Sequence, residues 1–124
     1  MIILFVDDDK EDYEMFCDAA QTLNPNLRCI HAIDGQQALD LLSNVIPDFI
    51  FLDINMPVMG GEECLIRIKQ KKAWRQIPVI IYSTTRHPNE IKTFKMLGAQ
   101  DFIAKPPVFN ELVLSLKPIL NTNR

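Results

Sequence analysis

Four short, mostly apolar runs of this sequence end in polar side chains that could take part in chemistry. In chain order, these side chains are Asp7 with Asp8 and Asp9, then Asp53, then Ser83, and finally Lys105. Carboxylate oxygens suit Mg²⁺, which proteins hold with one or two carboxylates together with phosphate oxygens. A carboxylate can also act as a nucleophile and form an aspartyl phosphate, while a metal, a lysine and a hydroxyl neutralise the phosphoryl oxygens. The set therefore predicts phosphoryl chemistry on a carboxylate.

Each of these residues also has a purely structural interpretation. The acids at 7–9 could cap a helix, Asp53 could form a turn, Ser83 could be a loop hydroxyl and Lys105 a surface charge. Taken singly, these interpretations are reasonable. Four such groups, each at the end of a different strand, are improbable as an accident. The combination favours a site.

Asp53 follows the most informative of the apolar runs. Residues 49–52, Phe-Ile-Phe-Leu, show no polar alternation. Such a run is typical of a strand that is covered on both faces in a parallel sheet. The run at 2–6 has the same character and ends at Asp7. Ligands of open α/β sheets bind beyond the carboxyl ends of the strands, so these two strands would place several carboxylates around one cation.

The rest of the chain alternates between strand and helix patterns. Further strands are predicted near 28–32, 78–82 and 101–104. Helices are predicted to begin at Asp9, at Asp34–Gly35, after Gly60–Gly61, near Asn89 and at Pro106–Pro107. Pro118 predicts a kink or a frayed end in the last helix. The alternation predicts a flavodoxin-like (βα)5 fold, a doubly wound parallel sheet of five strands in the order 2-1-3-4-5.

Length and composition set the class of protein. The 124 residues fit one domain, 1–124, and apolar residues at 48% with charged residues at 23% exclude a disordered chain. A formal net charge of −3 and the lack of a basic block argue against direct nucleic-acid binding. Cys17, Cys29 and Cys64 have no paired spacing, which favours free thiols in a reducing compartment. No apolar run approaches the ~20 residues of a membrane span, so we expect a cytoplasmic protein without membrane insertion.

Over essentially the whole chain, the sequence resembles the CheY-like receiver domain of bacterial response regulators. The resemblance lies in Val6-Asp7-Asp8, in residues 53–57 with Gly60-Gly61, in residues 78–83 and in Lys105-Pro106. It implies a domain of a two-component system that accepts a phosphoryl group from a histidine kinase or a phosphotransfer protein. It also implies that the domain is not an enzyme with a separate substrate and catalyses only its own phosphorylation and dephosphorylation.

The resemblance also implies roles for individual residues. Asp53 would be the phosphoacceptor, Asp8 a direct Mg²⁺ ligand and Asp7 a ligand through water. The backbone carbonyl of Asn55 would complete the protein's share of the metal ligands. Asn55 and Thr85 would line the path of the water that removes the phosphoryl group.

The remaining implied roles concern the phosphoryl group and the switch. Ser83 would hydrogen-bond the bound phosphoryl group and Lys105 would pair with it. Phe102 would change rotamer when Ser83 moves and would alter a face formed by residues 89–116, where a downstream protein binds. The Lys105–Pro106 peptide bond would be cis.

Some positions depart from the common pattern of that family. The three consecutive acids leave the metal-binding pair open between Asp7–Asp8 and Asp8–Asp9, and we choose the former because it directly follows the strand. Thr84 stands where a small alanine is frequent, so its bulk could narrow access to Asp53. Pro107 replaces a large apolar residue and could displace the start of the last helix.

Two other classes of protein compete with this interpretation. Aspartate-nucleophile phosphatases of the haloacid dehalogenase type also use Asp, Ser or Thr, and Lys at strand ends, but they need an acidic pair after the lysine. In this sequence, Glu111 is the only acidic residue after Lys105. A receiver-like binding module would normally have lost one of the site residues, and none is lost. Because only residues 121–124 follow the last predicted helix, we expect no output domain in this chain, so the output would lie in a partner or in a part that was removed.

Overall fold

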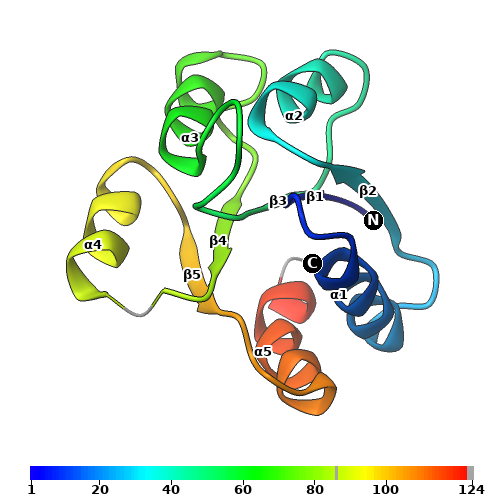
Figure 1. The fold of residues 1–124 in the computed structure, drawn as a ribbon. Helices are drawn as coiled ribbons and strands as arrows, with labels where there is room; N and C mark the ends of the chain where they lie inside the picture. The colour runs from blue at the N-terminus through cyan, green and yellow to red at the C-terminus, as the bar shows by residue number, and fades with distance from the viewer. Residues whose placement is uncertain (86, 123–124) are drawn as a thin grey trace.

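The computed structural model describes residues 1–85 and 87–122, and its sheet confirms the predicted fold. Five parallel strands lie in the order β2-β1-β3-β4-β5 (Figure 1). The strands are β1 (Ile2–Val6), β2 (Arg28–Ala32), β3 (Phe49–Leu52), β4 (Val79–Ser83) and β5 (Asp101–Ala104). The helices are α1 (Lys10–Leu23), α2 (Gly35–Leu42), α3 (Gly61–Gln70), α4 (Pro88–Met96) and α5 (Phe109–Thr122).

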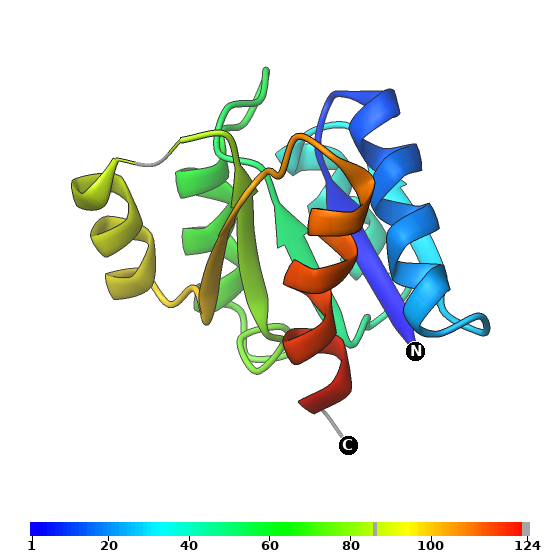
Figure 2. The ribbon, with the colours of Figure 1, turned by 90° about the horizontal axis from the view of Figure 1, so that it is seen from below.

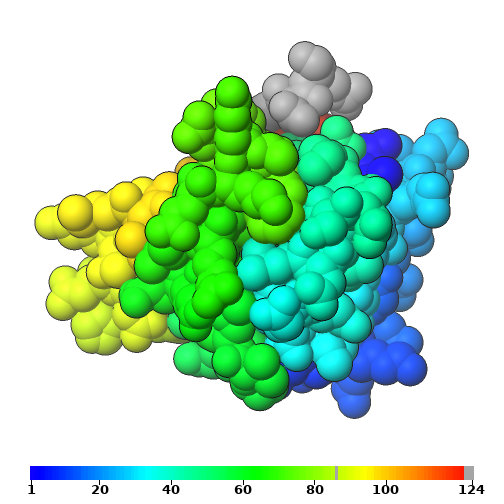
Figure 3. All heavy atoms as spheres, turned by 90° about the horizontal axis from the view of Figure 1, so that it is seen from above, coloured from blue at the N-terminus to red at the C-terminus, as the bar shows by residue number. Residues whose placement is uncertain are grey.

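Helices cover both faces of the sheet, which explains the unbroken apolar runs of the central strands. In β1, Ile3 and Phe5 pack with α1 and α5, whereas Leu4 and Val6 pack with α2 and α3. Figure 2 shows α1 and α5 side by side on one face, and Figure 3 shows the opposite face with α2 and α3 together and α4 at the edge. A strand between two such layers has no solvent side, so the alternation of polar and apolar residues is lost.

Aspartates fix the starts of the first two helices immediately after their strands. The Asp9 side chain accepts hydrogen bonds from the backbone N–H groups of Glu11 and Asp12, and Asp34 accepts one from Gln37. These bonds satisfy amides that the first turn of a helix leaves free. After the C-terminal end of α4, Gly98 has φ +112°, as expected for a residue that ends a helix in the left-handed region.

The last helix differs from the prediction at both ends. It begins at Phe109 and not at Pro106–Pro107, and the N–H of Leu112 donates to the carbonyl of Val108 at 3.2 Å. The residue before a proline avoids helical geometry, which keeps this stretch extended. The helix also does not fray at Pro118 but continues to Thr122. Pro118 lies on the exposed side of the helix, while Leu116 and Leu120 bury the opposite side.

Among residues 1–85 and 87–122, no helix has the length and apolar character needed to cross a bilayer.

Candidate functional site

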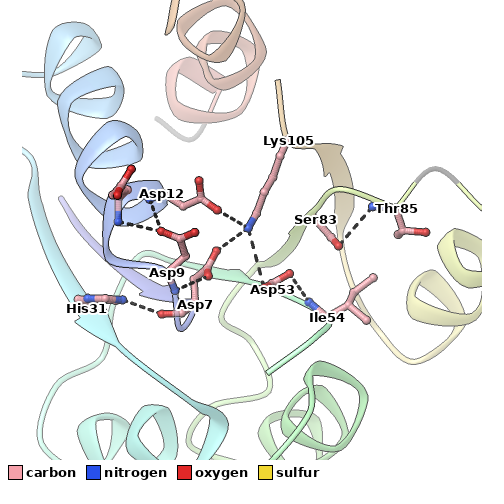
Figure 4. Close-up of polar contacts among 10 residues, drawn as sticks. Asp7, Asp9, Asp12, His31, Asp53, Ile54, Ser83, Thr85 and Lys105 are labelled. Atoms are coloured by element: carbon pink, nitrogen blue, oxygen red, sulfur yellow. Dashed lines mark hydrogen bonds and ion pairs between the residues drawn. The ribbon is translucent and has the colours of Figure 1, made fainter. Parts of the chain in front are cut away.

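Asp7 and Asp53, which the sequence pattern predicts as site residues, directly follow β1 and β3. The N–H of Asp53 donates to the carbonyl of Val6 at 2.9 Å, and the N–H of Asp7 donates to the carbonyl of Ala32 at 3.0 Å. Each bond continues a strand ladder by one residue. The two acids therefore stand directly at the tips of their strands, on the same edge of the sheet (Figure 4).

Three carboxylates meet at this edge. Asp7, Asp8 and Asp53 each offer an oxygen, and the three oxygens lie within 4.8 Å of one another. Asp7 and Asp53 are buried, with 1% and 8% of their surface exposed, whereas Asp8 is open to solvent. Asp9 points elsewhere and caps α1. The structure thus brings the Asp7–Asp8 pair to Asp53, and not the alternative pair Asp8–Asp9.

Lys105 extends from the end of β5 into the same cluster. Its Nζ lies 2.8 Å from Asp7 Oδ2, 2.7 Å from Asp12 Oδ2 and 3.9 Å from Asp53 Oδ2 (Figure 4). The lysine side chain is 12% exposed, so it carries its charge into a mostly dry environment. Lys105 is bound more closely by Asp7 and Asp12 than by Asp53.

Asp12 was not predicted as a site residue. It lies in the first turn of α1, three residues after the capping Asp9. The available signal was this spacing, because a residue at that position of a helix that leaves a strand tip stands over the same edge of the sheet. In the sequence alone, Asp12 is one more acid of an acidic segment.

Burial and crowding of charge determine the protonation of the site. Burial raises the pKa of Asp53 to about 6; Lys105 opposes this rise and the charge of Asp7 adds to it. Burial likewise raises the pKa of Asp7 above its ordinary value. For Lys105, burial lowers the pKa, but hydrogen bonds to Asp12 and Asp7 outweigh it and the pKa rises. The metal-free site is therefore short of positive charge.

The donor set fits a divalent cation. Three oxygen ligands in close proximity, two of them nearly buried, are the type of site that hard cations such as Mg²⁺ and Mn²⁺ occupy. A cation there would stabilise the ionised forms of Asp7 and Asp53, whose pKa values burial raises. The neighbouring N–H of Ile54, which donates to Asp53 Oδ1 at 2.8 Å, holds the carboxylate in place.

Ser83 and the residues after it lie beside this cluster. Ser83 is buried at the end of β4, and its Oγ accepts a hydrogen bond from the N–H of Thr85 at 3.4 Å. Thr84 is exposed. The structure therefore puts the predicted hydroxyl at the predicted strand end, with its oxygen bound to its own loop.

Asn55 and Phe102 lie farther out. Asn55 is exposed in the loop after β3, and its backbone N–H helps to stabilise the Asp53 carboxylate. Phe102 is half-buried on β5 and packs against the apolar cluster under α2, α3 and α4, which includes Phe94.

His31 is a second residue near the site that sequence reasoning missed. Its Nε2 lies 2.7 Å from the backbone carbonyl of Asp7, and its ring stacks on Tyr13 with 4.3 Å between ring centres. A carbonyl only accepts, so this bond requires a proton on Nε2. His31 thus fixes the backbone at Asp7 from the neighbouring strand β2.

Gly61 allows α3 to start directly against the loop that follows β3. Its N–H donates to the carbonyl of Ile54 at 2.9 Å, and a Cβ atom at this position would lie 2.5 Å from the carbonyl oxygen of Asp53. Such a distance is far inside van der Waals contact. Glycine is therefore required here by the close approach of two backbones.

One expectation about the site is wrong. No cis peptide bond occurs among the described residues, so the bond between Lys105 and Pro106 is trans. The trans form is the intrinsically preferred one for a bond before proline. Lys105 reaches both Asp7 and Asp12 from this backbone, so these contacts do not require the cis form.

Comparisons with known proteins agree with this architecture. A family model described as the response regulator receiver domain matches residues 3–117. The phosphorylated cyanobacterial phytochrome response regulator RcpA has a similar structure, with a TM-score of 0.90 and 27% identity over 99% of this chain and 96% of that chain. The Mn²⁺-bound form of response regulator Rcp1 aligns with a TM-score of 0.84 and 26% identity over 95% of this chain and 90% of that one.

Curated relatives are longer than this chain. The transcriptional regulatory protein CpxR of Escherichia coli K12 is 35% identical over 118 residues, which are 95% of this chain and 48% of that protein. A protein-glutamate methylesterase/protein-glutamine glutaminase of Syntrophomonas wolfei is 39% identical over 102 residues, which are 73% of this chain and 28% of that protein. The chain thus spans less than half the length of these two relatives.

Proposed function

Because this chain belongs to the response regulator receiver domain family of two-component signalling, we propose that Asp53 is its phosphoacceptor and that phosphorylation switches a protein-binding surface. One observation carries the proposal. Asp53 is a nearly buried carboxylate at a strand tip, within 4.8 Å of two further carboxylates and 3.9 Å from a lysine ammonium. This is the arrangement that a phosphoryl acceptor requires.

In the proposed reaction an ionised oxygen of Asp53 attacks the phosphorus of the donor. A new P–O bond forms, the bond between phosphorus and the donor's leaving atom breaks, and the leaving group takes its proton from solvent. With a pKa of about 6, Asp53 is ionised at neutral pH and ready to attack. The N–H of Ile54 orients the carboxylate by binding Oδ1, which leaves Oδ2 on the side of Lys105.

Asp7, Asp8, Asp53 and the carbonyl of Asn55 would hold a divalent cation, which we propose is Mg²⁺. When bound, the cation supplies positive charge that offsets the phosphoryl oxygens. Lys105 would pair with one phosphoryl oxygen, and Ser83 would donate a hydrogen bond to another after its hydroxyl turns away from the loop.

We propose that the phosphoryl donor is a histidine kinase or a phosphotransfer protein and that the domain acts in the cytoplasm, where such donors present their phosphohistidine. The downstream protein would bind to residues 89–116. Support comes from an apolar hollow on α4 that Ile91 and Met96 line together with Lys92 and Lys95, where Met96 is 78% exposed. Apolar residues rimmed by polar ones are typical of interaction surfaces.

The proposed catalysis is confined to the domain's own phosphoryl group. Asn55 and Thr85 would line the path of the water that hydrolyses it, so substitutions there should alter phosphate lifetime more than loading. A panel of phosphate esters should not be turned over. Sustained release of phosphate from a sugar phosphate would instead favour an aspartate-nucleophile phosphatase.

The deciding experiment is intact-mass spectrometry after incubation with acetyl phosphate and Mg²⁺. We expect one added phosphoryl group on the native chain and none on Asp53→Asn or in the presence of a chelator. Undiminished labelling of Asp53→Asn, or no labelling of the native chain, would refute the assignment.

A further inference from the structure

The Lys105 ammonium lies closer to two other carboxylates than to Asp53, the proposed phosphoacceptor. Its Nζ lies 2.7 Å from Asp12 and 2.8 Å from Asp7, both direct ion pairs, but 3.9 Å from Asp53 (Figure 4). Hydrogen bonds connect Nζ to the first two carboxylates and none connects it to the third. In the unphosphorylated protein the lysine is therefore drawn toward α1, to the side of the place where a phosphoryl group would be bound.

The two carboxylates that bind Lys105 differ in their relation to the candidate metal site. Asp7 belongs to the cluster of three oxygens that suits a cation, so its charge is shared with any metal at the site. Asp12 lies outside that cluster, on a helix and not on a strand tip. A bound cation therefore leaves the pair between Asp12 and Lys105 in place. A phosphoryl group on Asp53 must therefore compete with Asp12 for the ion pair with Lys105.

We propose that Asp12 is a positioning residue that holds Lys105 in its resting place and so limits how readily Asp53 is phosphorylated. This inference rests on the proposed function. The strength of the competition follows from exposure. The Lys105 side chain is 12% exposed but that of Asp12 is 37% exposed, so water screens the pair in part. Removal of the Asp12 charge should therefore raise the rate of loading by about two- to fivefold.

The test compares three variants at saturating Mg²⁺ with acetyl phosphate as the donor. Asp12→Asn keeps the shape of the side chain and removes its charge. Glu14→Gln removes the same charge from an exposed position of the same helix and is the matched control. Asp12→Glu keeps the charge on a longer arm and should restore the native rate. We expect faster loading in Asp12→Asn alone.

A second readout separates positioning from a structural role. Beryllofluoride, a stable mimic of the phosphoryl group, should bind Asp12→Asn more tightly by the same factor, with affinity unchanged in Glu14→Gln. Thermal melting of each variant checks the fold. If the native chain is loaded and Asp12→Asn is loaded at the native rate or more slowly, the positioning role is wrong. If the native chain is not loaded at all, the proposed function itself fails.

Discussion

The fold keeps the Asp53 carboxylate nearly dry, and this has a measurable consequence for stability. Burial raises its pKa to about 6, above the value near 3.9 of an unfolded chain. Between these two pH values the folded protein binds more protons than the unfolded chain. The contribution of Asp53 to stability is therefore largest below about pH 4 and is lost as the pH rises through 6.

Asp53→Asn should consequently stabilise the metal-free protein at neutral pH. We expect a gain of about 2 kcal/mol in the free energy of unfolding at pH 7.5 and little gain at pH 4, measured by urea denaturation in a chelating buffer. Asp18→Asn, which changes an exposed carboxylate of α1, is the control and should leave the pH dependence as it is. An equal effect of both substitutions would show that burial of Asp53 is not the cause.

Residues differ in how far the sequence could predict them. Asp53, Ser83 and Lys105 follow directly after apolar runs, so the strand pattern alone places them at one edge of the sheet. Asp12 follows no such run, and its partner Lys105 is 93 positions away. Its spacing from the capping Asp9 places it over the strand ends, but nothing local to Asp12 identifies Lys105 as its partner. It depends on how α1 lies across the ends of β1 and β5, which only the tertiary structure determines.

At the scale of elements, α3 packs closely against the loop after β3. A Cβ atom on Gly61 would lie 2.5 Å from the carbonyl oxygen of Asp53, whereas one on Gly60 would have its nearest neighbour at 3.7 Å. Gly61→Ala should destabilise the protein by about 1–3 kcal/mol, because α3 or the loop must move. Gly60→Ala should be nearly neutral. Thermal melting of the two variants side by side is the measurement, and equal melting temperatures would contradict the contact.

Pro118 gives a second prediction at this scale. A proline within a helix costs about 3 kcal/mol relative to alanine, yet α5 passes through Pro118 to its end at Thr122. Pro118→Ala restores a backbone donor and should stabilise the protein by about 1–3 kcal/mol in urea denaturation. Pro107→Ala, in the segment before the helix, provides no helical hydrogen bond and should give no such gain. A loss of stability in Pro118→Ala would show that α5 depends on the proline.

The elements also show where pattern reasoning stops. The strands at 28–32 and 101–104 were predicted with their observed bounds, because Gly, Pro and Asp punctuate the sequence on both sides. The start of α5 lies later in the chain than the pattern predicts, since two prolines fit the first turn of a helix as well as an extended segment. Its continuation past Pro118 depends on Leu116 and Leu120, whose burial against the sheet outweighs the local signal.

For the whole molecule, the two ends of the sheet should respond differently to phosphorylation. Trp74 lies in the segment between α3 and β4, which enters β4 at the edge opposite Asp53, and it is buried beneath Lys71. We therefore expect little change in tryptophan fluorescence when Mg²⁺ and beryllofluoride are added. A large change would mean that the switch extends through the full length of the sheet.

We expect phosphorylation to reshape the side of the sheet near α4 instead. A phosphoryl group adds about 1.5 to 2 negative charges beside buried carboxylates, so Ser83 and Lys105 are drawn toward the new oxygens. If Ser83 moves inward, it leaves space behind it. Phe102 is half-buried and pairs in the strand register with Ile81, two residues before Ser83; it packs against the cluster that contains Phe94, the only buried residue of α4. An inward turn of Phe102 would therefore change the support of α4.

This coupling should be modest, and it can be tested directly. Phe102 lacks the hydroxyl of a tyrosine, so its inward state gains buried surface but no hydrogen bond. With Mg²⁺ and beryllofluoride we expect backbone amide shifts in residues 89–116 as well as in the loops around Asp53. Phe102→Ala should bind the mimic as the native chain does, yet show smaller shifts at Ile91 and Lys95. If the amides of residues 89–116 do not shift in the native protein, these residues are not the surface that phosphorylation switches.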